Sequence, residues 1–354
     1  MGADRTRSAA LDFLTDEQQH RWTTVLEHLI SALPYEGRLV LVDGFDHQAG
    51  LLANRLADRL RELGRPCVRL AAGDCVGGEE NSWPGLAAGA IVIADGPRWR
   101  DRLPAEHWHL NIWVRTAPHG NGYSGDYRGD QAHAVIDLHD PTWPVIRHLD
   151  PFLVPGDYWY HTESRAFFAC RAATWDTKFG ADLPAYATAI AEARLLRDGT
   201  AVDLGCGTGR ALPALRDAVG PDGTVIGIDH TPQMLAQAQT RADAANAILL
   251  LADARHLPLA TGSVDAVFAA GLLNHLPSAP TGLQELARIT RPGGRLVLFH
   301  PSGHAALAAR HGRTLNPREP LAEPVLRATT TDAGWGLISY EDSARRFHAL
   351  AVRH

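Results

Sequence analysis

The chain has 354 residues, more than one hydrophobic core usually fills, so two domains are expected. Its hydrophobic content of 45% and charged content of 21% are those of an ordinary globular protein, and its net charge of −6 argues against nucleic acid or an anionic membrane surface as a partner. No signal-peptide core or run of about 18 apolar residues occurs, and the four cysteines lack metal-ligand spacing. A reduced, cytoplasmic protein is therefore predicted.

In the first half of the chain, short apolar runs alternate with helical or loop stretches. A helix capped by Thr15 is predicted over 15–32, and a second helix ends near Leu63. Strands are predicted at 39–42, 67–70, 89–96, 109–116 and 133–140. This alternation favours a parallel α/β sheet with crossover connections. The segment 140–157 carries four prolines and is the predicted border, which gives domains 1–150 and 151–354.

The first predicted strand leads through Asp43-Gly44 into a loop and a helix. In such a turn, backbone N–H groups and the helix N-terminus can hold phosphate. A working phosphate loop also needs a Lys followed by Ser or Thr, which the stretch 45–52 lacks, and Lys178 is the only lysine of the chain. Residues 35–150 resemble uridine-kinase-like P-loop proteins. With these groups missing, the resemblance implies a degenerate, inactive kinase-like domain. Such a domain could present an acceptor substrate to the rest of the protein, bind a nucleoside-like molecule or mediate self-association into a homo-oligomer.

The strongest motif lies in the second half, at 200–229. A strand at 200–204 meets Gly205-Cys206-Gly207-Thr208-Gly209, and a helix begins directly after this turn. Glycines at alternate positions allow a tight turn whose backbone a ligand can approach closely. The next strand ends at Asp229, whose carboxylate can accept hydrogen bonds from both hydroxyls of a ribose. A nucleoside-containing ligand is therefore expected at the carboxyl ends of a parallel sheet.

A dinucleotide-binding domain is the alternative, but its fingerprint has glycine where this chain has Arg210. Residues 334–353 also read as two antiparallel strands that close the sheet, which is not the usual end of such a domain. Residues 157–354 instead resemble class I S-adenosylmethionine (SAM)-dependent methyltransferases. Four stretches carry the resemblance in the family's order: VDLGCGTGR, VIGIDHTPQML, LLLADARHLPLATGSVDAVFAAGLLNHLP and ELARITRPGGRLVLFHP.

This resemblance implies a Rossmann-like sheet of seven strands with an antiparallel last strand, and SAM as the cofactor. The residues that it assigns to cofactor binding are Asp203, Gly205, Cys206, Gly207, Gly209, Asp229, His230, Met234, Asp253 and Ala254. Asp203 and the glycine turn would hold the methionine part and Asp229 the ribose, while the last four would surround the adenine.

SAM carries a methyl group already activated on a sulfonium, so aligning the acceptor would be most of the catalytic work. A hydroxyl or ammonium acceptor also needs a base near neutral pH. The candidates are His275 and His300, which follow the fourth and fifth predicted strands of this domain; a structural role at a turn is the alternative for each. The expected acceptor is a small molecule. The alternative to an enzyme is a SAM-binding sensor or scaffold.

An aromatic-rich stretch precedes the first methyltransferase-like strand. In the resembling enzymes this segment folds over the cofactor, and aromatic faces suit a sulfonium cation. Tyr160, His161 and Trp175 are therefore candidates for the acceptor pocket, with simple packing of a helix on the sheet as the alternative. His300, His304 and His311 have no carboxylate to complete a ligand set, so no metal site is predicted.

Overall fold

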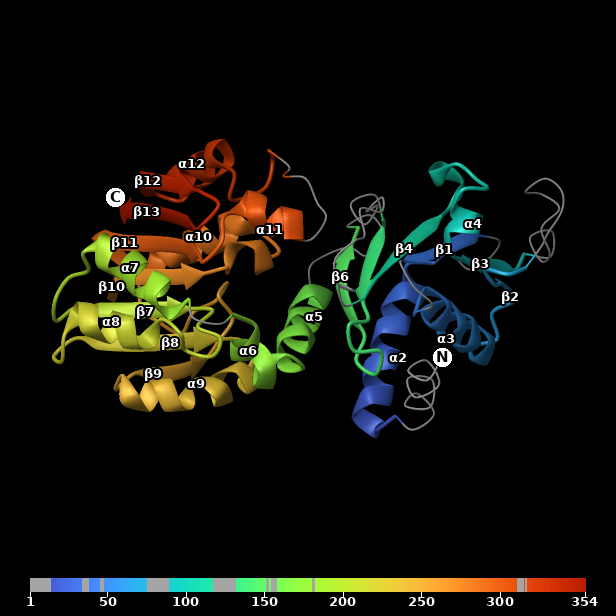
Figure 1. The fold of residues 1–354 in the computed structure, drawn as a ribbon, viewed down its shortest axis with the longest axis horizontal. Coiled ribbons are helices and arrows are strands. Elements are labelled where there is room, and N and C mark those ends of the chain that lie inside the picture. Colours follow the sequence, from blue (N-terminus) through green and yellow to red (C-terminus); the bar gives the residue numbers. More distant parts are fainter. Residues whose placement is uncertain are drawn as a thin grey trace. The chain divides into compact units, whose positions relative to one another are not determined.

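The computed structural model describes residues 14–33, 38–44, 48–74, 89–116, 132–150, 153, 158–179, 182–310, 315 and 317–354 (Figure 1). The chain divides into two compact α/β units, Met1–Ser164 and Arg165–His354. The division falls inside helix α5 (Tyr158–Ala169), later in the chain than the border predicted at 150/151. Within the described ranges, no helix is both long enough and apolar enough to span a membrane.

The first unit is built on a six-stranded sheet with the order β2-β3-β1-β4-β5-β6. Its strands are β1 (Leu39–Gly44), β2 (Cys67–Leu70), β3 (Ile91–Asp95), β4 (Leu110–Arg115), β5 (Ala134–Asp137) and β6 (Val145–Leu149). Its helices before α5 are α2 (Asp16–Ser31), α3 (Gln48–Glu62), the short α4 (Pro97–Arg100) and the 3₁₀ turn η3 (Ala105–His107). The first five strands run parallel, as predicted, but β6 pairs antiparallel with β5.

Strand β6 lies inside the proline-rich segment that was predicted as a border. The prolines of this segment flank the strand, with Pro144 before it and Pro151 after it, so its own N–H groups remain available for pairing. The strand is also tied to α5. Glu163, 1% exposed, pairs with the buried Arg21 of α2 and accepts a hydrogen bond of 2.6 Å from the N–H of Ile146. The first unit therefore extends into α5.

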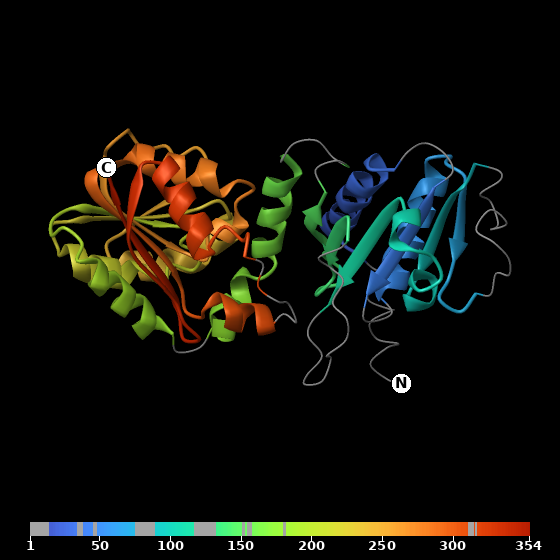
Figure 2. The same ribbon diagram turned by 90° about the horizontal axis from the view of Figure 1, so that it is seen from above.

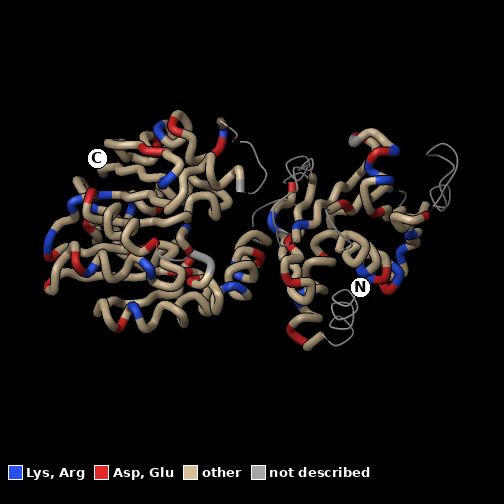
Figure 3. Tube along the Cα trace, in the orientation of Figure 1, with Lys and Arg blue, Asp and Glu red and all other residues tan. Residues whose placement is uncertain are grey.

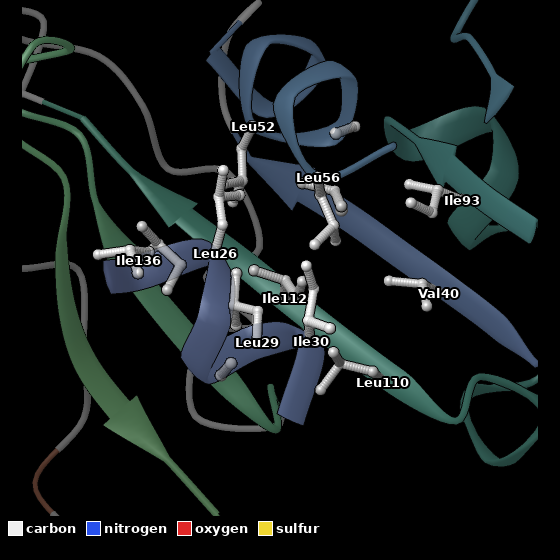
Figure 4. Close-up of a cluster of buried hydrophobic side chains, with 14 of the residues drawn as sticks. Leu26, Leu29, Ile30, Val40, Leu52, Leu56, Ile93, Leu110, Ile112 and Ile136 are labelled. Atoms are coloured by element: carbon white, nitrogen blue, oxygen red, sulfur yellow. The ribbon is translucent and has the colours of Figure 1, made fainter. Parts of the chain in front are cut away.

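The core of the first unit lies between the sheet and helices α2 and α3. Thr15 caps α2 in a capping box with Gln18, as predicted. The apolar stripes of both helices meet side chains from one face of the strands (Figure 4): Leu26, Leu29, Ile30, Val40, Leu52, Leu56, Ile93, Leu110, Ile112 and Ile136. The alternate residues Leu39 and Leu41 of β1 pack on the other face, in a cluster with Trp99 and Trp108.

The second unit is built on a seven-stranded sheet with the order β12-β13-β11-β10-β7-β8-β9. Its strands are β7 (Thr200–Leu204), β8 (Thr224–Asp229), β9 (Ile248–Leu251), β10 (Val264–Ala270), β11 (Thr290–His300), β12 (Trp335–Asp342) and β13 (Phe347–Arg353). Strand β13 is antiparallel to both of its neighbours, and the pairs among β7 to β11 are parallel.

Helices cover both faces of this sheet (Figure 2). Helices α10 (Ala279–Ile289) and α12 (Glu323–Asp332) pack on one face, and α7 (Leu183–Ala193) and α8 (Leu212–Val219) pack on the other. The remaining helical elements are η4 (Ala172–Thr174), α6 (Trp175–Phe179), α9 (Pro232–Ala244), η5 (Leu273–His275) and α11 (His304–Arg310).

The strand order places the turn after β7 at a particular point of the sheet. From β7 the chain continues to β8 and β9 on one side, whereas β10 and β11 lie on the other side. In open parallel sheets, ligands bind outside the carboxyl ends of the strands where the order switches in this way. The glycine-rich turn after β7 occupies this switch point.

Candidate cofactor-binding site

The glycine-rich turn leaves one side of its backbone open. Gly207 and Gly209 have positive φ angles of 53° and 78°, which disfavour any residue with a side chain. A Cβ on Gly209 would lie 2.9 Å from Cδ1 of Leu212, so this glycine is needed for packing. A Cβ on Gly207 would meet no atom within 4 Å. Gly207 therefore faces free space in which a ligand can lie against the backbone.

The carboxylate of Asp229 holds this turn from the neighbouring strand. Its Oδ2 accepts a hydrogen bond of 2.9 Å from the N–H of Gly207, and its Oδ1 accepts one of 2.8 Å from the N–H of Thr231. The backbone contributes as well, because the N–H groups of Gly205 and Cys206 both donate to the carbonyl of Ile228. Each carboxylate oxygen has two lone pairs, so Asp229 retains capacity for a ribose hydroxyl.

Asp203 presents a buried carboxyl group that lacks a full set of partners. Its side chain is 2% exposed, and Oδ2 has no hydrogen-bond partner among the described residues. Burial, together with the nearby charge of Asp229, raises the pKa of Asp203 to about 8. A buried acceptor without a partner is costly, and a cation brought against it would satisfy it. The open side of Gly207 and this carboxyl group both fit SAM, which carries an ammonium and a sulfonium group.

The thiol of Cys206 belongs to the same turn. The side chain is buried, and burial, with the charges of Asp203 and Asp229, raises the pKa of the thiol well above its ordinary value. A thiol in this state is a poor nucleophile. Cys206 therefore contributes to the turn by packing.

The residues expected around the adenine lie after β8 and β9. Met234 of α9 and Ala254 are buried, and His230 is partly exposed. The carboxylate of Asp253 is engaged by Arg255, whose Nε lies 3.1 Å from both oxygens and whose Nη2 lies 2.8 Å from Oδ2. The sequence analysis did not anticipate this pair, and the role of Asp253 toward adenine stays a prediction.

The ring of Phe168 contacts three of the residues predicted for the site. The ring centroids lie 5.6 Å from Trp175, 6.1 Å from His230 and 5.1 Å from His275, all in edge-on arrangements. These residues come from four places in the chain: α5, α6, the end of β8 and η5. Phe168 lies in the aromatic stretch but was not among the residues predicted for the site.

Tyr160 and His161 belong to the first unit, whereas the glycine turn belongs to the second. The ring of Tyr160 contacts Trp159, and burial raises the pKa of its hydroxyl although Arg147 lowers it. Trp175, the third residue predicted for the acceptor pocket, belongs to the second unit and packs on the Phe168 ring that also contacts His230.

Three imidazoles lie at the carboxyl edge of the second sheet. His275 ends η5, and Nδ1 of His300 lies 2.8 Å from the carbonyl oxygen and 3.1 Å from the nitrogen of Ser302. His304 is 7% exposed, its Nδ1 lies 3.2 Å from Oδ2 of Asp342, and its Nε2 has no hydrogen-bond partner among the described residues. In the part of the chain that the structure describes, no three His, Cys, Asp or Glu side chains are grouped to hold a metal; His311 lies outside that part.

The raised pKa of Asp203 makes the free energy of unfolding depend on pH. The ligand-free folded state keeps a proton that the unfolded chain releases above about pH 4, so stability should fall as the pH rises toward about 8. Relative to Asp203→Asn, the wild-type chain should lose up to about 1.4 kcal/mol per pH unit over this window. Urea unfolding of both chains without ligand, from pH 5 to 8.5, measures the difference. Parallel stability curves would show that Asp203 is ionised in the folded state.

Comparisons with known proteins agree with this geometry. Residues 202–298 match a family model described as a methyltransferase domain. Over 118 residues the chain is 41% identical to an uncharacterized 37.1 kDa protein in transposon TN4556 of Streptomyces fradiae, a match that covers 33% of this chain and 34% of that protein. Over 102 residues it is 37% identical to an arsenite methyltransferase of Halobacterium salinarum, covering 28% and 26% of the two chains.

A third relative is a demethylmenaquinone methyltransferase of Bacillus licheniformis, 35% identical over 107 residues, which are 30% of this chain and 46% of that protein. The chain thus spans less than half the length of each of these relatives. The matched segment contains the glycine turn, Asp229 and Asp253. The second unit therefore contains a class I SAM-dependent methyltransferase domain, and S-adenosylmethionine is its cofactor.

Proposed function

We propose that this protein transfers the methyl group of SAM to a small-molecule acceptor. The observation that carries the proposal is the turn at the switch point, which combines the open side of Gly207 with the buried carboxyl groups of Asp203 and Asp229 within the segment that matches methyltransferases. Arsenite and demethylmenaquinone methyltransferases are named for small-molecule acceptors, which supports the same class here. Acidic and basic residues alternate along both units, without a long basic stretch for a phosphate backbone (Figure 3).

Bound SAM supplies an activated methyl group, and the residues of the chain bind and orient it. Asp229 would accept from the ribose while it keeps its bond to Gly207. Asp203 would hold the ammonium group of the methionine part, and this cation would favour the ionised carboxylate, so that cofactor binding would release the proton of Asp203 below about pH 8. Phe168 and Trp175 provide aromatic faces that exclude water beside the cofactor.

The acceptor proton is taken up by His275 or His300 in this proposal. Both residues follow parallel strands, β10 and β11, whose carboxyl ends border the site. The contact between His275 and Phe168 supports His275 as the nearer candidate, because the same ring touches His230 at the cofactor end. A SAM-binding sensor or scaffold without transfer is the alternative function, and turnover of an acceptor separates the two.

We also propose that the first unit is a degenerate kinase-like scaffold that presents the acceptor and does not transfer phosphate. Asp43, at the end of β1, is buried, accepts from the N–H of Gly44 at 2.9 Å and pairs with Arg100 at 2.8 Å. In the sequence, Asp43 comes directly before Gly44 and the stretch 45–52, which lacks the Lys and the hydroxyl of a working phosphate loop. Residues 45–47 of the loop lie outside the described residues. The cytoplasmic location and the homo-oligomeric state stay predictions.

Asp229→Ala should weaken SAM binding. The variant loses the bonds to the ribose and the bond that holds Gly207, which together should cost about 2–3 kcal/mol, or roughly 30- to 150-fold in Kd. Titration calorimetry on the full chain measures this loss. Asp265→Ala is the matched control, because this carboxylate accepts from the N–H of Thr200 at the opposite edge of the sheet. Unchanged SAM affinity in Asp229→Ala would contradict the assignment of Asp229 to ribose binding.

His275→Ala or His300→Ala should slow methyl transfer by about 10²- to 10⁴-fold without changing SAM affinity, since a base acts only in the chemical step. Single-turnover transfer to an identified acceptor, with melting temperatures measured in parallel, tests this. His304→Gln is the comparison for a structural imidazole, because its Nδ1 faces Asp342, and it should lower the melting temperature with little effect on rate. Near-normal rates in both alanine variants would contradict a base at His275 or His300 and would mean that alignment of the acceptor alone accounts for catalysis. A loss of rate in His304→Gln alone would instead identify His304 as the base.

ATP should not bind to the first unit with the affinity of a working phosphate loop. The stretch 43–52 offers only backbone N–H groups and a helix N-terminus, with no Lys, Ser or Thr for phosphate or Mg²⁺. The test is a titration of MgATP into the full chain already saturated with SAM, which blocks adenosine binding in the second unit. Tight, Mg²⁺-dependent binding under these conditions contradicts the proposal of an inactive domain.

A further inference from the structure

The segment from Phe168 to Thr177, here called the cap segment, contacts the glycine turn through a side chain that the sequence analysis passed over. Oδ1 of Asp176 accepts a hydrogen bond of 2.7 Å from Oγ1 of Thr208. Thr208 lies between Gly207 and Gly209 and is 2% exposed, whereas the side chain of Asp176 is 39% exposed. A residue of the turn itself is therefore bonded to the segment that precedes the sheet.

Two arginines strengthen this contact. Nη1 of Arg241, from α9, lies 2.7 Å from Oδ2 of Asp176 and donates to the carbonyl of Thr208 at 2.9 Å. Nη1 of Arg210, directly after the turn, lies 3.9 Å from Oδ1 of Asp176. Burial alone would raise the pKa of Asp176, but the bonds from Thr208 and Arg241 and the charges of both arginines outweigh it and lower the pKa. Asp176 is thus ionised at neutral pH, which strengthens the bond from Thr208.

The cap segment also contacts the other end of the site. Phe168 begins the segment and touches His230, beside the position expected for adenine, and His275. Trp175, which precedes Asp176, packs on the same Phe168 ring. The described contacts of the segment thus include polar ones at the glycine turn and aromatic ones at His230 and His275. The open side of Gly207 lies in the turn that the polar contact holds.

We propose that Asp176 and Thr208 form a latch that holds the cap segment against the glycine turn and slows the release of SAM. The two residues act as positioning residues, because they hold the turn and the segment and do not themselves contact the reacting atoms. Breaking their bond removes the direct hydrogen bond between the segment and the turn and leaves the link through Arg241, which loosens the segment and opens the way for the cofactor to leave. This inference rests on the proposed binding of SAM at the turn.

The latch is tested by the rate at which the full chain loaded with methyl-tritiated SAM releases the label into excess unlabelled SAM. Thr208→Val removes the donor and keeps the shape of the side chain, and Asp176→Asn weakens the acceptor at a partly exposed position. Each should release SAM about tenfold faster, with association changed by less than about threefold. Thr208→Ser keeps the hydroxyl and should release SAM at the wild-type rate.

Thr177→Val is the matched control, since its hydroxyl donates to the carbonyl of Thr174 within the cap segment and not to the turn. In the double variant Thr208→Val/Asp176→Asn the two effects should not add, because both changes act on the bond between these residues. Asp176→Asn also weakens the ion pair with Arg241, so this variant should be the faster of the two single variants.

Wild-type release rates in both Thr208→Val and Asp176→Asn would overturn the latch without contradicting the proposed binding of SAM at the turn. Slower association and lower melting temperatures that Thr208→Ser does not restore would show a purely structural contact and would also overturn it. A wild-type chain that binds no SAM would overturn both the latch and the proposed function.

Discussion

The hydrogen bond from the N–H of Gly207 to the carboxylate of Asp229 joins two neighbouring parallel strands at their ends, and the site depends on it. Parallel neighbours finish at the same edge of a sheet, so a side chain at the end of β8 can reach the backbone of the turn after β7. Together with the bonds from the N–H groups of Gly205 and Cys206 to the carbonyl of Ile228, this hydrogen bond holds a turn that has positive φ angles. The Cβ position of Gly207 remains open, and a side chain there would fill that space.

Around this bond the second unit combines groups of different chemistry. Asp203 and Asp229 supply carboxyl groups. Oδ2 of Asp203 has no hydrogen-bond partner in the described part of the chain, and Asp229 is already bonded to the turn. Phe168 supplies an apolar ring that touches residues from two strand ends. Asp176 connects the turn to α9 and to the segment before β7. The second unit thus links residues that precede the matched segment 202–298 to the turn inside that segment.

The parts of this fold that sequence could predict are those set by local pattern. The strand, glycine turn and acidic residue at 200–229 appear as expected, and so do the closing hairpin and the cap at Thr15. Strand β6 was missed because prolines on both sides of it give the composition of a linker, while its pairing with β5 is a tertiary property. Asp176 and Phe168 were missed as site residues for a similar reason. Their partners Thr208 and His275 lie tens of residues later in the chain, and the amino acids next to Asp176 and Phe168 in the sequence give no sign of these contacts.

Asp203 carries a consequence for the charge of the site. Without a ligand, its burial favours the protonated and uncharged form up to about pH 8. With the ammonium group of SAM against it, as proposed, the carboxyl group gives up that proton as the organic cation arrives. Below about pH 8, loading at this point is then an electroneutral exchange of one cation for another. While the cofactor is absent, the proton on Asp203 spares this end of the sheet a second negative charge beside that of Asp229, so two acids can be buried close together without mutual repulsion.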